Sequence, residues 1–283
     1  RVERGKYLAH HVAVCIDCHA TRDWGKFGIP PVPNTDGKGG EVFDQKLGFP
    51  GTYYSTNITP YELKKWTDGE IYRAIVAGVS RDGRALFPVM PHPNYGRMSK
   101  EDIYSIIAYL RTLKSLVNDV PTSKSDFPYQ IAINYLPKKP NHKEIPPKTD
   151  KVKYGEYLAN AAICLYCHTP NDKGRPIMDK AYSGGFEFPL PTGGYVRSGN
   201  LTQDKATGIG RWTQEDFIDR FKAYKSNVYT APKVAANTFN TFMPWTMYAD
   251  MNEEDLIAIY EYLKTIKPIF NKVNKFSLQP ANK

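Results

Sequence analysis

Two five-residue stretches decide the fold of this chain, CIDCH at residues 15–19 and CLYCH at residues 164–168. Both follow the pattern Cys-x-x-Cys-His, and together they contain all four cysteines of the sequence. The pattern is typical of covalent haem c attachment. Two thiols three positions apart on one turn of helix can each bond to a vinyl group of the porphyrin. The sequence therefore predicts two haem c groups, held by Cys15 and Cys18 and by Cys164 and Cys167.

The histidine that closes each stretch, His19 or His168, is the predicted proximal ligand of the iron. Other interpretations of the cysteines fit less well. A structural zinc site would need its two pairs roughly 15 to 20 residues apart, whereas these pairs are 149 residues apart. A thioredoxin-like motif would need a βαβ context. Disulfides within the pairs would leave both histidines unexplained.

The second half of the chain repeats the first. The pattern Gly-x-Tyr-Leu-Ala precedes each attachment stretch, at residues 5–9 and at residues 155–159. Asn-x-Thr followed by Trp-Thr comes midway through each half, and Met-Pro comes late in each half. Each of these methionines is followed 19 residues later by Tyr-Leu. The matching order and the equal final spacing indicate a duplicated unit.

Helix caps and apolar spacing predict an all-α fold. The capping box at 67–70 and the polar caps at 99–102 and 252–255 each begin a helix. We expect two tandem class I-like cytochrome c domains, each enclosing one covalently bound haem between its crossing first and last helices. Gly5 and Gly155 would suit such crossings.

A proline- and lysine-rich connector joins the two halves. Six prolines between residues 115 and 151, with no good helical period, predict a stiff segment. The expected organisation is a first cytochrome c domain at 1–114, a linker at 115–150 and a second cytochrome c domain at 151–283.

The sixth iron ligand decides whether a haem only transfers electrons, because an enzyme or a gas sensor leaves that position open or weakly held. Met90 lies in an apolar loop between prolines and is the predicted ligand, since a thioether favours ferrous iron. Met98, beside Arg97 and Ser99, looks more like a residue of a solvated turn or a hydrophobic staple. His92 is close enough to compete and would give bis-histidine ligation at a lower potential.

In the second half Met243 occupies the repeat position and is the predicted ligand. Met247 and Met251 are its neighbours, but they do not match the repeat, and a methionine can simply fill a gap in a core. His10 and His11 are expected at the surface or in packing, and His142, in the proline-rich connector, is expected to be solvent-exposed. Some aromatic and basic residues could line the pockets or donate to haem propionates: Trp66, Trp212, Tyr53, Tyr54, Tyr195, Arg84 and Arg197.

Composition and charge narrow the class of function. No apolar run approaches the roughly 18 to 20 residues of a membrane helix. We therefore expect a soluble chain, with any membrane association through a partner or an anchor absent from this sequence. The net charge of +9 could steer an acidic redox partner. The sequence has no arginine-rich tract or aromatic–basic interleaving of the kind that nucleic-acid binders carry, so nucleic acid is not an expected partner.

Several stretches resemble the multihaem cytochrome c subunits of membrane-associated bacterial dehydrogenases for alcohols, gluconate and similar substrates. They are Gly-x-Tyr-Leu-Ala before each attachment stretch, SGGF at 183–186, GNLTQDKATGIGRWT at 199–213 and the two Met-Pro loops. The resemblance implies one haem at Cys15, Cys18, His19 and Met90, and another at Cys164, Cys167, His168 and Met243.

The expected function is electron transfer by a dihaem cytochrome c, from a dehydrogenase or a quinol-linked donor to a downstream acceptor. Haem attachment of this kind predicts work in the periplasm or at the outer side of the membrane. The alternative is a dihaem enzyme that resembles a thiosulfate dehydrogenase or a cytochrome c peroxidase. Such an enzyme needs one haem with an open position or a distal His or Cys, and no spare cysteine exists. An electron carrier is therefore favoured.

Overall fold

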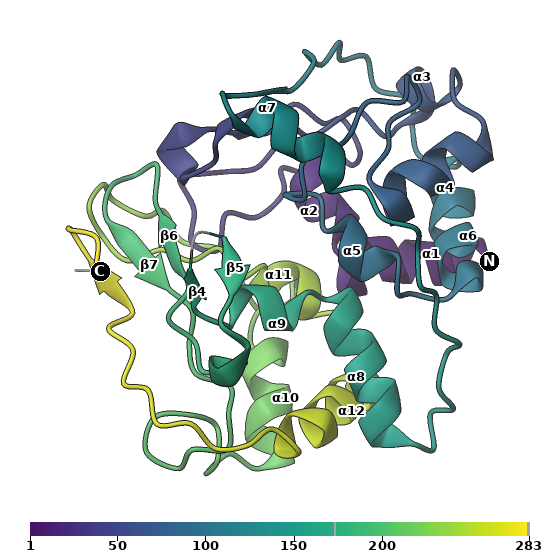
Figure 1. The fold of residues 1–283 in the computed structure, drawn as a ribbon. Helices are drawn as coiled ribbons and strands as arrows, with labels where there is room; N and C mark the ends of the chain where they lie inside the picture. Colours follow the sequence, from purple (N-terminus) through teal and green to yellow (C-terminus); the bar gives the residue numbers. More distant parts are fainter. Residues whose placement is uncertain (173, 282–283) are drawn as a thin grey trace. The chain divides into compact units, whose positions relative to one another are not determined.

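A computed structural model of the chain describes residues 1–172 and 174–281. It divides into two compact units, which are described in turn (Figure 1). The first unit consists of Arg1–Asp23 and Pro30–Ile145, and the second consists of Trp24–Ile29 and Pro146–Lys283. The predicted limits of the two haem domains and of the linker stay predictions, because contacts alone define these units.

Two helices of the first unit that are far apart in the sequence, the N-terminal one and the one at residues 100–110, cross at a glycine. α1 (Val2–Tyr7) runs into a π-helical turn, η1 (Leu8–Val12), and α1 lies against α6 (Lys100–Leu110) (Figure 1). A Cβ atom on Gly5 would lie 1.8 Å from the carbonyl oxygen of Ser105. Only glycine lets two helix backbones approach so closely, and this is the crossing that the sequence predicts.

Short helices surround this crossing. α4 (Asp68–Ala77) begins with the predicted capping box, in which Thr67 and Glu70 each accept a hydrogen bond from the backbone N–H of the other. It ends at Gly78, which has a φ of 70° that a glycine adopts without strain. The other helices and turns of the unit are α2 (Cys15–His19), η2 (Gln45–Leu47), α3 (Pro60–Leu63), α5 (His92–Tyr95), α7 (Tyr129–Ala132) and η3 (Ile133–Tyr135).

A small antiparallel sheet lies beside these helices in the first unit. Its strand order is β1 (Val42–Phe43), β2 (Gly51–Tyr54) and β3 (Lys124–Ser125). Phe43 pairs with Tyr53, and Gly51 pairs with Ser125. β3 comes after α6 in the chain, so the chain returns to this sheet once α6 has ended.

The second unit repeats this plan. α8 (Lys151–Ala161) crosses α12 (Glu253–Lys264) (Figure 1), and a Cβ atom on Gly155 would lie 1.8 Å from the carbonyl oxygen of Ala258. The side chain of Asp150 caps α8 by accepting from the Lys153 N–H. The other helices and turns are α9 (Cys164–Cys167), η4 (Met178–Lys180), α10 (Gln214–Lys222) and α11 (Trp245–Tyr248).

Two antiparallel sheets belong to the second unit. One is a hairpin of β4 (Asn171–Asp172) and β5 (Arg175–Pro176). The other has the order β6-β7-β8, built from β6 (Glu187–Pro189), β7 (Tyr195–Arg197) and β8 (Phe276–Ser277). β8 follows α12 as β3 follows α6.

The prediction of an all-α fold is wrong. Helices cover only 35% of the chain, and strands in three sheets accompany them. These strands are two to four residues long, which is too short to show the alternation of apolar and polar residues that a strand pattern requires. Glycine-rich and proline-rich stretches between the helices therefore looked like loops in the sequence.

A short segment of the first half is built into the second unit. Residues 24–29 form a β-bridge through Lys26 and Lys233. The Phe27 N–H donates to the carbonyl oxygen of Pro232 at 2.9 Å, and the Val234 N–H donates to that of Gly25 at 2.8 Å. Among the described residues, no helix combines the length and the apolar character needed to cross a membrane.

Candidate haem-binding sites

An apolar cavity in the first unit brings together residues of the attachment stretch at 15–19 and the predicted methionine ligand. The cavity is partly open to solvent and spans about 740 Å³ of space not filled by protein atoms. Cys15, His19 and Met90 all line it, whereas Cys18, on the same turn as Cys15, does not. Apolar side chains form most of the remaining wall, among them Ile58, Leu63, Trp66, Ile71, Ile75, Leu86, Ile106 and Leu110.

The attachment turn of the first unit is preceded by an unusual backbone. Val14 has a φ of 43° and a ψ of 41°, in the left-handed region that β-branched residues rarely occupy. α2 begins directly after it. The Tyr95 hydroxyl donates to the carbonyl oxygen of Ala13 at 2.7 Å, and the Gly39 N–H donates to that of His19 at 2.8 Å. The turn is thus fixed at both of its ends.

His19 is held from behind, as a metal-bound imidazole commonly is. Its Nδ1 lies 2.7 Å from the carbonyl oxygen of Thr56. A carbonyl oxygen can only accept, so Nδ1 carries the proton and Nε2 keeps its lone pair. Burial lowers the pKa of His19, which also favours the neutral ring. These features fit an iron-ligating imidazole.

The cysteines are suited to covalent attachment rather than to binding a metal as thiolates. Burial raises the pKa of Cys15 and of Cys164 to about 12, so both thiols are protonated in the chain without a bound group. Among the described residues, no group of three or more His, Cys, Asp or Glu side chains is arranged to hold a metal ion. The zinc interpretation therefore has no geometric support.

Met90 lies in the loop before α5. The His92 N–H donates to the carbonyl oxygen of Met90 at 2.7 Å, and the Phe87 ring stacks on Tyr53 with 4.3 Å between centroids. Met98 does not line the cavity and is 0% exposed. Of the two roles expected for Met98, the solvated turn is wrong, whereas a hydrophobic staple fits a buried residue directly before the Ser99 N-cap of α6.

His92, the predicted rival of Met90, does not line the cavity. It is 2% exposed, and its ring lies so close to Gly78 that a Cβ there would be 2.5 Å from ring atoms. Burial lowers the pKa of His92 to about 4. The ring therefore packs on the end of α4.

The other histidines have hydrogen-bonding partners. His10 Nε2 lies 2.6 Å from the Tyr109 hydroxyl, which fits the packing role expected for it. His142 is half-buried. Its Nδ1 lies 2.5 Å from the carbonyl oxygen of Met98, and its Nε2 lies 2.5 Å from the Tyr72 hydroxyl. The expectation that His142 is solvent-exposed is wrong, because the connector packs back onto the first unit at this point.

The attachment stretch of the second unit has the same local geometry. Ile163 takes the left-handed conformation, with a φ of 52°, directly before α9. His168 Nδ1 lies 2.8 Å from the carbonyl oxygen of Gly199, and burial lowers the pKa of His168. The Tyr248 hydroxyl donates to the carbonyl oxygen of Ala162 at 2.9 Å. Cys164 and Cys167, on α9, are both half-buried.

Met243 lies in the loop directly before α11, as Met90 lies before α5. Its side chain is half-buried, and its N–H donates to the Thr241 hydroxyl at 3.0 Å. Met247 is 7% exposed and Met251 is 1% exposed. Met251 stands at the place of Met98 in the repeat, because both lie 8 residues after the Met-Pro methionine, and both are core residues.

The residues considered as pocket or propionate partners divide into two groups. Trp66 lines the first cavity, and Tyr53 supports the Met90 loop through Phe87. Arg197, in contrast, hydrogen-bonds within and beside the sheet that contains it: it donates to Glu187, to Ser277 and to the carbonyl oxygen of Asn274. The rest lie as follows: Tyr54 on β2, Tyr195 on β7, Trp212 before α10 and Arg84 paired with Asp82.

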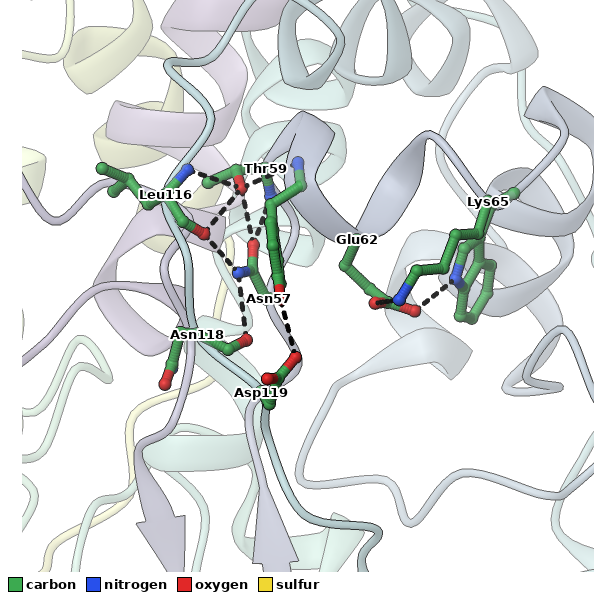
Figure 2. Close-up of polar contacts among 9 residues, drawn as sticks. Asn57, Thr59, Glu62, Lys65, Leu116, Asn118 and Asp119 are labelled. Carbon is green, nitrogen blue, oxygen red and sulfur yellow. Dashed lines mark hydrogen bonds and ion pairs between the residues drawn. The ribbon is translucent and has the colours of Figure 1, made fainter.

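Residues 116–118, here called the strap, support the backbone behind His19 and were not predicted from the sequence. Asn57, the residue after Thr56, donates to the carbonyl oxygen of Leu116 at 2.8 Å and accepts from the Thr59 N–H at 2.9 Å (Figure 2). The Leu116 N–H in turn donates to the Thr59 hydroxyl at 3.2 Å. The strap therefore fixes the stretch whose carbonyl oxygen orients the imidazole.

An equivalent strap, residues 269–271, exists in the second unit. Asn200 donates to the carbonyl oxygen of Ile269 at 2.8 Å and accepts from the Thr202 N–H at 2.9 Å. The sequence did carry a signal, since the pattern Leu-x-Thr-x-Lys-x-x-x-Asn-x-Val occurs at 110–120 and again at 263–273. It was missed because the first copy lies at the start of the proline-rich connector.

Comparison with known protein families gives a match in the second half of the chain. The family model for cytochrome c matches residues 152–267. The expectation of two tandem class I-like cytochrome c domains is therefore corrected, because the match covers one domain in the second half. The first half departs from the repeat in its middle, where YELKK at 61–65 replaces the longer glycine-containing stretch before Trp212.

Several relatives match nearly the whole chain, among them three cytochrome subunits of dehydrogenases. The cytochrome c subunit of alcohol dehydrogenase (quinone) from Gluconacetobacter polyoxogenes is 27% identical over 99% of this chain and 59% of its own length. The fructose dehydrogenase cytochrome subunit of Gluconobacter japonicus is 28% identical, over 94% and 52%. The gluconate 2-dehydrogenase cytochrome c subunit of Pantoea cypripedii is 28% identical, over 94% and 59%. The chain thus spans about half to three-fifths of their length.

The predicted resemblance is confirmed by these matches. The residues brought together in the first unit recur in the second, within the stretch that the family model covers. Residues 152–267 match the family model for cytochrome c, and nearly the whole chain is similar to the cytochrome c subunits of bacterial alcohol, fructose and gluconate dehydrogenases.

Proposed function

We propose that this chain is a dihaem cytochrome c that transfers electrons from a dehydrogenase or a quinol-linked donor to a downstream acceptor. One observation carries the proposal. In each unit the histidine after the cysteine pair has its Nδ1 tied to a backbone carbonyl oxygen, at 2.7 Å for His19 and 2.8 Å for His168. That arrangement leaves two equivalent Nε2 atoms as ligands for two irons.

The proposed ligands of the two irons are His19 with Met90 and His168 with Met243. When bound, haem c supplies a reversible one-electron change between ferrous and ferric iron. The chain's own residues determine how easily that change occurs. Thioether ligands would favour the ferrous state, and the mostly apolar wall around Trp66 would surround the first haem. Met90 and Met243 would each occupy the second ligand position of their iron, which would leave no position for substrate.

The proposed partner is a dehydrogenase, and the proposed place of work is the periplasm or the outer side of the membrane. The support comes from the printed names of the relatives, which are cytochrome subunits of dehydrogenases. The net charge of +9 adds an attraction to an acidic partner, which would raise the association rate at low ionic strength.

Mass spectrometry of the mature polypeptide and a redox titration test the haem assignment. We expect two covalently bound haems and a low-spin spectrum with the near-infrared absorption of thioether-bound ferric iron. Met90→Ala and Met243→Ala should each remove about half of that absorption. Met98→Leu and Met247→Leu, which change buried methionines outside the proposed ligand set, should leave it intact. One haem, or full absorption in both alanine variants, would contradict the proposal.

Steady-state assays test the proposed class of function. The protein should accept electrons from a quinol-linked dehydrogenase and should show no turnover with thiosulfate or peroxide. Carbon monoxide should not bind the reduced protein at neutral pH, since both axial positions are filled. Clear turnover with either substrate, or a high-spin haem that binds carbon monoxide, would favour the enzyme instead.

A further inference from the structure

Both methionine loops have aromatic contacts, which in the second loop join Phe242 to Trp24 and Phe188, but the two loops differ at one equivalent position. Phe87 comes three residues before Met90, and Asn240 comes three residues before Met243. The Phe87 ring is stacked on Tyr53, at 4.3 Å and an interplanar angle of 21°. The first loop is thus fixed by apolar stacking, and the corresponding residue of the second loop is a polar amide.

Asn240 is buried, and its side-chain amide makes three hydrogen bonds. It is 1% exposed. Its Oδ1 accepts from the Gly28 N–H at 2.9 Å and from the Thr241 N–H at 2.8 Å. Its Nδ2 donates to the carbonyl oxygen of Lys26 at 3.1 Å. A buried amide of this kind fixes one arrangement of the backbone around it, because every alternative would leave polar groups unpaired.

Two routes lead from Asn240 to Met243. Thr241, whose N–H is held by Asn240, accepts from the Met243 N–H through its hydroxyl at 3.0 Å. Gly28, whose N–H is also held by Asn240, lies beside the Met243 backbone, and a Cβ on Gly28 would be 3.8 Å from the carbonyl oxygen of Met243. The Asn240 amide therefore holds Thr241, which bonds to the Met243 N–H, and Gly28, which lies next to the Met243 carbonyl oxygen.

The segment that Asn240 contacts is itself fixed. Residues 24–29 belong to the second unit and are tied to the stretch before Asn240 by two backbone hydrogen bonds, from Phe27 to Pro232 and from Val234 to Gly25. Phe27 also stacks on Tyr224, at 6.4 Å and 16°. A fixed segment gives the amide a rigid frame against which to hold the loop.

We propose that Asn240 is the positioning residue for Met243, and that it keeps the thioether sulfur directed at the second iron by tying the methionine loop to residues 24–29. This inference rests on the proposed function, in which Met243 is an iron ligand. It assigns to the second haem a buried amide at the position where the first loop has the Phe87 ring. The two sites should therefore respond to different substitutions.

The experiment uses the full, haem-loaded chain and four variants. Asn240→Leu replaces the amide by an apolar side chain of similar size, and Asn240→Asp keeps the two acceptor contacts but loses the donor. Phe87→Leu is the matched control in the first unit, and Met243→Ala is the ligand control. The readouts are the near-infrared absorption of thioether-bound ferric iron per haem, and a titration of the ferric protein with imidazole, which replaces a loosely held methionine.

Asn240→Leu should lower the thioether absorption at one haem of the two. Where the bond persists, imidazole should bind that haem about tenfold more tightly, since the lost hydrogen bonds correspond to roughly 1.4 kcal/mol. Asn240→Asp should give a smaller change of the same sign. Phe87→Leu should affect the other haem, so the double variant Asn240→Leu with Phe87→Leu should weaken both.

The outcomes separate this inference from the proposed function. If Met243→Ala removes half of the absorption while Asn240→Leu and Asn240→Asp leave the absorption and the imidazole affinity unchanged, the positioning role is refuted and the ligand assignment stands. If Met243→Ala removes nothing, the ligand assignment fails first. If Asn240→Leu does not fold, Asn240→Asp decides, and a change at both haems equally would indicate a general structural role.

Discussion

The crossing of α1 with α6, and of α8 with α12, gives the sharpest prediction, because it is decided by single atoms. A Cβ on Gly5 would lie 1.8 Å from the Ser105 carbonyl oxygen and 2.8 Å from the Tyr109 Cβ. Ordinary contact begins near 3.4 Å, so in Gly5→Ala the helices must separate by about 1.6 Å. Both neighbours are helix atoms that cannot rotate away.

The cost follows from that separation. Overpacking of a core costs about 1–3 kcal/mol, and a gap of 0.5–1 Å already forfeits a quarter to a half of a van der Waals contact. The better helix propensity of alanine returns up to about 1 kcal/mol. We expect Gly5→Ala to destabilise the first unit by ~2 kcal/mol. Gly155→Ala should do the same in the second unit, since its Cβ would also lie 1.8 Å from a carbonyl oxygen.

Urea unfolding of the haem-loaded protein measures the effect. With a slope of about 2 kcal/mol per molar urea, the midpoint of the affected transition should fall by about 1 M. Gly69→Ala is the matched control: it lies in α4, its nearest foreign atom would be 4.0 Å away, and it should be neutral or stabilising. If Gly5→Ala and Gly155→Ala unfold at the same urea concentration as Gly69→Ala, the close approach of the backbones is refuted.

Three further predictions concern the first unit. Asn57→Ala should destabilise it by about 1–3 kcal/mol in urea unfolding, because the Thr59 N–H and the strap carbonyl oxygen lose their buried partner. Tyr95→Phe should cost about 1 kcal/mol in the same assay, because the carbonyl oxygen of Ala13 loses its donor. Glu70→Gln should flatten the dependence of stability on acid pH: the Thr67 N–H lowers the pKa of Glu70 from 4.5, so its contribution is present above that pH and is lost as the pH falls through the lowered pKa.

Controls for these three are available on the same chain. Asn134→Ala, an exposed asparagine on η3, should change stability by less than about 0.5 kcal/mol. Tyr104→Phe changes a tyrosine that is 40% exposed and should be close to neutral. If stability depends on pH in the same way in Glu70→Gln and in the parent protein, the stabilising role of the Glu70 carboxylate is refuted. If Asn57→Ala is as stable as Asn134→Ala, the stabilising role of the hydrogen bonds between Asn57 and the strap is refuted.

Much of the site could be predicted from the sequence because its residues are fixed by chemistry at short range. The thiols and the imidazole of residues 15–19 must be adjacent to reach one porphyrin, and the Met-Pro loops repeat at a constant distance from the last helix. Glycine at positions 5 and 155 could be assigned to a helix crossing for the same reason, since the repeat placed both before an attachment stretch.

The parts that were not predicted depend on contacts between residues far apart in the chain. The strand Lys124–Ser125 has only two residues, and its pairing with Gly51 and Thr52 leaves no local pattern. Met98 lies between charged and polar neighbours and is nevertheless fully buried, because one face of a short turn points into the core. The membership of residues 24–29 in the second unit depends on Asn240, more than 200 positions later.

The left-handed residue before each attachment stretch bears on how far the motif can be transplanted. Val14 and Ile163 adopt a conformation that is rare for β-branched residues and costs about 1–2 kcal/mol. In a free peptide that conformer would be a small minority. The rest of the unit, through Tyr95 or Tyr248, selects it. Grafting CIDCH or CLYCH onto a foreign loop would therefore transfer the reactive side chains without the left-handed backbone conformation that orients them.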